Sequence, residues 1–159
     1  WVHPTYAPPQ RWTGTELEPL YRTASFERIA LLGSDEALVS GPGSILHVDG
    51  TTLTWHDDLV SLEARSAAGG IAWLVGQDEL VAWEAGTPTH HPMTGVLDVW
   101  AGSSTEVVAT GRNLVQRWDG STWTDETPSA PSGRDLDHVA GGGDAVWTAG
   151  GDALLRRDR

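Results

Sequence analysis

The sequence predicts an all-β protein, a small β-propeller of about four blades with four antiparallel strands in each. Three observations favour this class: apolar runs recur with one period, the runs are short, and glycine-rich turns separate them. Short runs rich in Val, Leu, Trp and Thr are typical of strands, because helices need longer apolar patterns. Four strands in about 40 residues are the pattern of one propeller blade.

The period is set by an apolar run that ends in glycine, which we assign to the second strand of each blade. A third strand follows after a polar turn and closes on an acidic residue. Both landmarks recur at spacings of 35, 35 and 39 residues, so they define one period independently. The glycines are Gly41, Gly76, Gly111 and Gly150, and the acids are Asp49, Glu84, Asp119 and Asp158.

The first and fourth strands complete each repeat. An Asp-Gly turn is a strong hairpin signal, because both residues tolerate positive φ. Such turns at Asp49 and Asp119 lead to Trp55 and Trp123, whereas Glu84 is followed by alanine, so the second repeat is degraded. The first strands begin with the pairs Phe26-Glu27, Leu62-Glu63, Leu97-Asp98 and Leu136-Asp137.

The domain organisation follows from these landmarks. The blades are expected at about 26–58, 62–93, 97–128 and 136–159, and the last one lacks a fourth strand. Residues 10–17 resemble the hairpin at 116–123, so the segment 10–20 can supply that strand. We predict that the N-terminal strand closes the last blade and so removes the exposed sheet edge.

Two alternatives to this closure remain open. Residues 10–12 resemble an additional third strand, which would suit a larger propeller or a ring completed by a second chain.

Residues 1–9 hold three prolines and no repeat match, and we expect an extended N-terminal arm there, because proline restricts φ and donates no hydrogen bond.

The composition excludes several functional classes. The formal net charge is -12, and all ten basic residues are arginine. Nucleic acids and anionic membrane surfaces need a basic patch, so neither is expected as a partner. The acidic surface favours solubility and suits a basic protein partner. No apolar run approaches the ~20 residues of a membrane span.

Cysteine is absent, which excludes disulfides and thiolate chemistry. The chain starts at Trp1, and we expect that a leader has been removed. The lack of lysine and the single Asn113 indicate a GC-rich bacterial source.

The sequence shows no recognisable catalytic or metal-binding pattern. A sialidase-like propeller would need a tyrosine nucleophile, and only Tyr6 and Tyr21 are available, both outside the repeats. His90 and His91 are adjacent on one predicted strand, and neighbouring strand residues point to opposite faces, so they are not expected to share a metal. We therefore expect no enzyme activity, no catalytic residue, no cofactor and no metal site.

Nine tryptophans stand against one phenylalanine. Those inside predicted strands are expected to pack between blades, because aromatic side chains dominate core energetics. Three others sit on or near the hairpins between the third and fourth strands, where a sugar-stacking platform is the alternative to packing. They are Trp12, Trp55 and Trp123.

The blades also resemble a known group of proteins. The segments 48–55 (VDGTTLTW) and 118–123 (WDGSTW) are similar to blades of secreted bacterial β-propellers, relatives of the Asp-box and photosystem II assembly factor propellers. The full Asp-box places a serine before the aspartate and one residue between Asp and Gly, so the likeness is to the blade and not to the box. The resemblance implies the propeller fold and an extracytoplasmic, periplasmic or secreted setting, and it implies no single function.

The loops that join the fourth strand to the next blade, and those that join the second strand to the third, gather at one face of a propeller. We expect binding at this loop face, because loops on a rigid scaffold carry function. The predicted function is a non-catalytic protein-binding or assembly module of an extracytoplasmic complex. The alternatives are a lectin-like carbohydrate binder and a fragment of a propeller hydrolase. The candidate contacts are Arg22, Asp58, Arg112, Asn113, Arg134 and Asp152.

Overall fold

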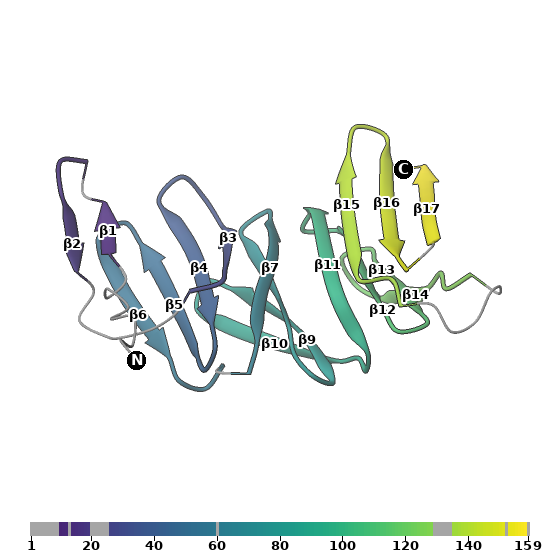
Figure 1. Cartoon of the computed structure of the whole chain (residues 1–159), viewed down its shortest axis with the longest axis horizontal. Coiled ribbons are helices and arrows are strands. Elements are labelled where there is room, and N and C mark those ends of the chain that lie inside the picture. The colour runs from purple at the N-terminus through teal and green to yellow at the C-terminus, as the bar shows by residue number, and fades with distance from the viewer. Residues whose placement is uncertain are drawn as a thin grey trace, which may run out of the picture.

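The computed structural model describes residues 10–12, 14–19, 26–59, 61–128, 135–151 and 153–158. Every regular element in these ranges is a strand, and all strand pairs are antiparallel (Figure 1). The predicted all-β class is thereby confirmed. No helix that is long and apolar enough to cross a membrane occurs in these ranges.

Four successive sheets form the body of the molecule, and we call them blades 1 to 4. Blades 1 to 3 each contain four strands in chain order. Blade 1 consists of β3 (Arg28–Leu31), β4 (Glu36–Gly41), β5 (Ser44–Asp49) and β6 (Thr52–His56). Blade 2 consists of β7 (Glu63–Ala68), β8 (Ile71–Val75), β9 (Glu79–Glu84) and β10 (Thr87–Pro92).

Blade 3 consists of β11 (Val96–Ser103), β12 (Glu106–Gly111), β13 (Leu114–Trp118) and β14 (Trp123–Asp125). Blade 4 contains three described strands, β15 (His138–Gly142), β16 (Ala145–Gly150) and β17 (Ala153–Asp158). A separate hairpin pairs β1 (Gln10–Trp12) with β2 (Leu17–Pro19). The predicted arm at residues 1–9 lies outside the described residues.

The first strand of each blade lies on the inside of an arc. β7 packs against β3 on one side and β11 on the other, and β11 packs against β15 (Figure 1). Apolar side chains from successive blades fill the space between the sheets, which produces three cores rather than one. Trp73 and Trp83 are 1% and 0% exposed within these cores, as predicted for tryptophans that pack between blades.

The predicted closure by the N-terminal strand is wrong for the described chain. β2 pairs with β1, Leu17 opposite Trp12, and not with β17. Figure 1 shows the β1–β2 hairpin and β17 at opposite ends of the molecule. The first strands of the first and last blades, β3 and β15, are also separated from each other there. The hairpin forms locally around Gly14, whose φ is +98°, and a local pairing requires less loop closure than a pairing across the whole chain.

The Asp-Gly turns match the predicted backbone only in part. Gly50 and Gly120 have positive φ, but Asp49 and Asp119 do not, whereas in the degraded repeat both turn residues, Ala85 and Gly86, have positive φ, at +46° and +84°. Asp119 organises its turn through its side chain: Oδ1 accepts hydrogen bonds from the backbone N–H groups of Ser121 and Thr122 at 2.8 Å, and Oδ2 accepts one from the Thr122 hydroxyl at 3.1 Å. The carboxylate thus holds the turn between β13 and β14.

We expect Asp119 to stay ionised well below the usual range for aspartate. The hydrogen bonds from Thr122 and Ser121 lower its pKa, because they favour the charged form. Since the folded pKa lies below the unfolded value of about 3.9, the stabilisation is present above that value and is lost as the pH falls through the folded pKa.

An NMR titration of the Asp119 carboxyl carbon tests this expectation. The signal should stay flat through the normal aspartate range in the folded protein. Ser121→Ala removes one of the hydrogen bonds that the Asp119 carboxylate accepts and should raise the midpoint. An ordinary aspartate midpoint in the unmodified chain would contradict the expectation.

Candidate binding face

An open cleft of about 190 Å³ lies between blades 1 and 2. It is formed where the inner strands β3 and β7 begin and where β4 turns into β5, so it lies on the loop face that the repeat pattern indicates. The cleft combines the charged side chains of Glu27, Arg28 and Glu63 with the turn at Pro42 and Gly43. Its lining residues are 27–28, 40–43 and 61–63.

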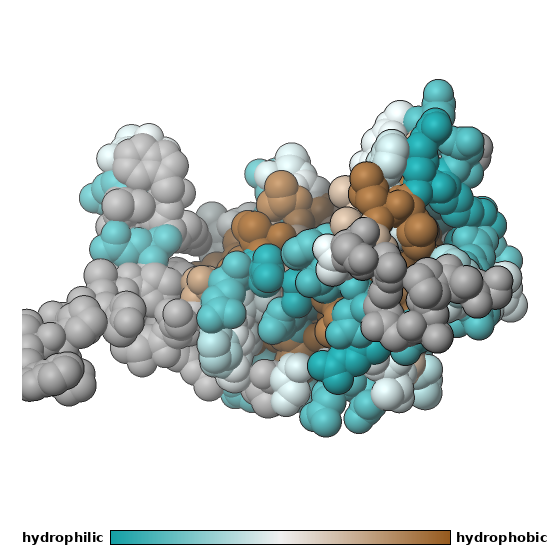
Figure 2. All heavy atoms as spheres, turned by 45° about the vertical axis from the view of Figure 1, so that its right-hand side comes forward, coloured by the Kyte–Doolittle hydropathy of each residue, from teal (hydrophilic) through white to brown (hydrophobic). Residues whose placement is uncertain are grey.

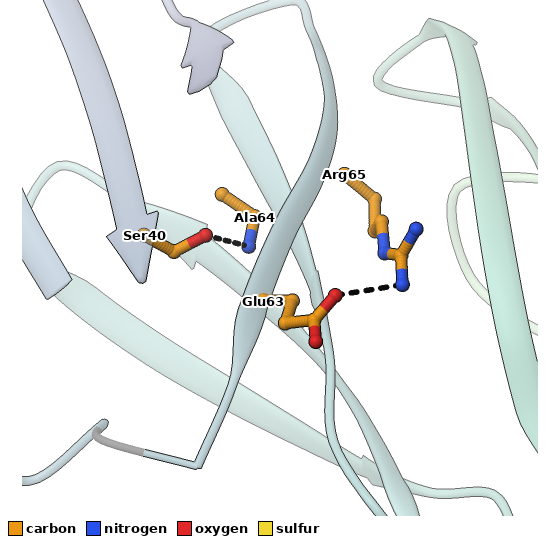
Figure 3. Close-up of polar contacts among 4 residues, drawn as sticks. All are labelled: Ser40, Glu63, Ala64 and Arg65. Atoms are coloured by element: carbon orange, nitrogen blue, oxygen red, sulfur yellow. Dashed lines mark hydrogen bonds and ion pairs between the residues drawn. The ribbon is translucent and has the colours of Figure 1, made fainter. Parts of the chain in front are cut away.

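Ser40 fixes the two blades at the base of this cleft. Its side chain is fully buried, and its Oγ accepts a hydrogen bond from the backbone N–H of Ala64 at 2.9 Å (Figure 3). A buried backbone N–H without a partner would cost about 1–3 kcal/mol. The serine therefore attaches β7 to blade 1 at a defined position.

Arg65 is a residue of this region that the sequence reasoning missed. The pairing of β7 with β8 skips Arg65, so the strand bulges between Ala64 and Ser66. Its guanidinium donates to a Glu63 carboxylate oxygen at 2.7 Å and points away from Ser40 (Figure 3). Bulges re-aim side chains in this way. The only sequence signal was the glutamate–arginine pair two residues apart.

The predicted contacts that are described lie in two different blades. Arg112 and Asn113 form the turn between β12 and β13, where Asn113 has a φ of +51°. Arg112 is exposed and lies 3.9 Å from Asp135 across a backbone bridge. Asp58 follows β6 in blade 1, exposed, with a carboxylate oxygen 3.9 Å from His56. The remaining predicted contacts lie outside the described residues: Arg22, Arg134 and Asp152.

The tryptophans proposed for sugar stacking are largely occupied by other rings. Trp123 lies within 5.9 Å of the rings of Trp73, Trp118 and His91, between blades 2 and 3. Trp55 stacks on Phe26 at 6.0 Å, with the two planes 19° apart. These contacts favour packing for both tryptophans, and the side chain of Trp12 lies outside the described part of the chain.

The adjacent histidines point to opposite faces, as expected for neighbours on a strand. His90 is exposed, with its Nδ1 2.7 Å from a Glu79 carboxylate oxygen. His91 packs against Trp73, and burial together with the charge of His90 lowers its pKa. No group of three or more potential metal-ligating side chains occurs among the residues whose positions are described.

A second cleft of about 300 Å³ lies between blades 3 and 4. Its walls are mainly apolar, with Val108, Val146 and Leu155 facing one another across the blades. The Arg157 guanidinium pairs with Glu126 at 2.9 Å beside it. This cleft is a product of blade packing and contains none of the predicted contacts.

No family model matches this chain, and no curated protein matches it in sequence. Solved structures do resemble it. A catalytically inactive virginiamycin B lyase from Staphylococcus aureus, solved with quinupristin, has a TM-score of 0.65 at 14% identity over 85% of this chain. YCF48 bound to D1 peptide has a TM-score of 0.57 at 15% identity over 96% of this chain.

PorZ, a bacterial surface component of the type-IX secretion system of Porphyromonas gingivalis, has a TM-score of 0.61 at 12% identity over 87% of this chain. The chain spans 52% of the lyase, 59% of YCF48 and 20% of PorZ. At sequence identities of 12–15%, a structural likeness shows only that the fold is shared. The sheets and these neighbours together show that the chain has a β-propeller-like fold.

Proposed function

We propose that this chain is a non-catalytic module that binds a partner protein through the cleft between blades 1 and 2. The observation that carries the proposal is the cleft itself, an open hollow on the loop face with two exposed carboxylates, Glu27 and Glu63, at its border. The polar groups at its base hold strands together, as the bond between Ser40 and Ala64 does. Such a rigid site suits recognition rather than chemistry.

The size and charge of the cleft indicate the class of partner. Its volume of about 190 Å³ is below the ~300–1,000 Å³ of typical small-molecule pockets. A protein segment that inserts one or two side chains fits this space better than a buried ligand does. In the cleft itself Arg28 lies beside Glu27, and Arg65 pairs with Glu63. From the net charge of -12 of the whole chain we infer a segment that carries basic residues.

Two structural neighbours agree with a role in assembly. YCF48 was solved with a peptide, and PorZ is a surface component of a secretion system. Together with the resemblance of the blades, they support the proposal of an extracytoplasmic setting and of a partner that is itself a protein.

Site-specific photo-crosslinking tests the position of the partner site. A photoreactive side chain at Pro42, in the cleft, is expected to capture one partner in cells of the source organism. The same group at Ser121, in the turn between β13 and β14, is the control for the opposite end of the blades. Capture from Ser121 but not from Pro42 would place the partner elsewhere.

The captured partner then allows an affinity measurement. Glu27→Lys is expected to weaken binding at least about tenfold, or ~1.4 kcal/mol, because it reverses a charge at the border of the cleft. Glu84→Lys makes the same charge change on an exposed residue at the far end of blade 2 and should leave affinity unchanged. Equal effects of the two variants would indicate non-specific charge attraction. Binding to a glycan array that Trp55→Ala abolishes would favour a carbohydrate binder instead.

A further inference from the structure

The two ends of the arc of blades expose apolar side chains that the interior of the arc buries. The large hydrophobic side chains most exposed among the described residues are Ile29 and Leu31 on β3, and Trp147 and Leu154 on β16 and β17, at 43–66% exposure. Figure 2 shows apolar atoms at the surface where blade 4 comes forward and again nearer the middle of the view. Exposed apolar patches of this kind mark interaction sites.

Ile29 and Leu31 occupy positions that face the preceding blade. The pairing of Ile29 with Val39 corresponds to that of Val99 with Ala109 in blade 3. Val99 is 3% exposed and packs in the core that blades 2 and 3 share. Ile29, on the first blade, is 60% exposed. We call the exposed part of β3 the leading face.

Trp147 and Leu154 occupy positions that face the following blade. Counted from the glycine that ends the second strand, Trp147 corresponds to Trp73, and Leu154 corresponds to Leu80. Trp73 and Leu80 are 1% and 0% exposed in the core between blades 2 and 3. We call the surface around Trp147 and Leu154 the trailing face.

The core between blades 2 and 3 shows what each face fits. There Trp73 and Leu80 of one blade pack with Val99 and Ala101 of the next. The two end faces present the same pair of surfaces, an aromatic–leucine pair on one side and two aliphatic residues on the inner strand on the other. They are the two separated halves of the kind of interface that joins blades 2 and 3. At the other two blade contacts the positions of Trp73 and Leu80 hold aliphatic residues, Leu38 and Ile45 in blade 1 and Val108 and Val115 in blade 3.

We propose that a second copy of this chain docks head to tail, so that the trailing face of each copy covers the leading face of the other. Two copies close one ring when the rotation between them returns to the start. The contact concerns the blade ends and not the cleft, so it can fail or succeed independently of the proposed partner site.

The solution mass of the purified chain tests the proposal. Light scattering after size exclusion should give twice the mass of one chain for the unmodified protein. Leu31→Arg and Leu154→Arg should each abolish the dimer, because either variant buries a charge in both contacts of the ring. Thr89→Arg introduces the same side chain at an exposed position of β10, away from both faces, and should leave the dimer intact.

Mixing the two variants separates head-to-tail docking from other arrangements. A Leu31→Arg copy keeps an unaltered trailing face, and a Leu154→Arg copy keeps an unaltered leading face. These two faces can still pack together, so the mixture should form a dimer with one intact contact. Circular dichroism verifies that each variant is folded. A monomeric unmodified chain, an open series of higher oligomers, or dimers that survive both substitutions would overturn the proposal.

Discussion

Replacing Trp73 with alanine is expected to lower the free energy of unfolding by about 3–5 kcal/mol. The indole is 1% exposed, and three rings from blades 2 and 3 lie within 6.3 Å of it, those of His91, Trp118 and Trp123. Truncation removes these contacts and leaves a cavity that two rigid sheets cannot close. The loss is a large share of the ~5–15 kcal/mol that stabilises a typical domain. Denaturant titration measures it.

Trp147→Ala is the matched control. Trp147 has the same place in its repeat but is 43% exposed, and its ring lies 5.7 Å from the Arg156 guanidinium carbon. Measured at a concentration at which the chain is monomeric, its loss should be clearly smaller, because less apolar area leaves water on folding. Trp73→Phe retains an aromatic ring and should lie between the two. Equal losses at positions 73 and 147 would contradict burial by the following blade as the cause.

This pair of tryptophans also shows what the sequence could predict. The alternation of apolar residues and the two landmarks place strands correctly, because a strand is a local structure and its pattern repeats with the blade. The sequence predicts packing for Trp73 and Trp147 alike, since their local patterns are the same. Whether a further blade covers Trp147 is a property of the whole arc, which no local pattern contains.

Other features depended on contacts that are distant in the chain. The N-terminal strand has a local partner in β1 and a distant candidate in β17, and sequence similarity cannot rank the two pairings. The bulge at Arg65 adds one residue to a strand without changing the composition, so the periodicity does not reveal it. The repeat does locate the ends of strands, but which charged residues share a cleft depends on how blades 1 and 2 pack.

The glycine that ends the second strand of each blade was the clearest landmark in the sequence. Its place before a turn suggests a turn glycine, but the structure gives another reason for glycine at this position. A turn glycine would have positive φ, but Gly111 and Gly150 are not among the residues with positive φ. Instead, the segment that leads into a first strand crosses directly over each of them. At Gly111 a Cβ atom would overlap the carbonyl of Gly95 and lie 2.9 Å from the Val96 Cα. At these two positions the landmark glycine therefore reflects close packing of backbone on backbone.

We accordingly expect Gly111→Ala to lower the free energy of unfolding by about 3 kcal/mol or more, because backbone has to move to admit the methyl group. The crossing segment is held by a hydrogen bond from the Arg112 N–H to the Gly95 carbonyl at 2.9 Å, and the Gly111 carbonyl accepts a second bond, from the Leu136 N–H that precedes blade 4, at 3.0 Å. A shift of the Gly95 segment that relieves the overlap also weakens the bond from Arg112. Denaturant titration at matched conditions measures the loss.

Two other glycines make a graded series with Gly111. At Gly76 the new methyl group would meet side-chain atoms of Leu62 and Glu79, at 2.7 and 3.0 Å, which can rotate away, so a loss of about 1 kcal/mol is expected. At Gly142 nothing lies within 4 Å and the backbone is ordinary strand, so alanine should be neutral or slightly stabilising through the unfolded chain. A uniform loss at all three sites would mean that alanine acts through strand propensity. The expected order, with Gly111 far above Gly76 and Gly142 near zero, requires that the crossing backbone sets the cost.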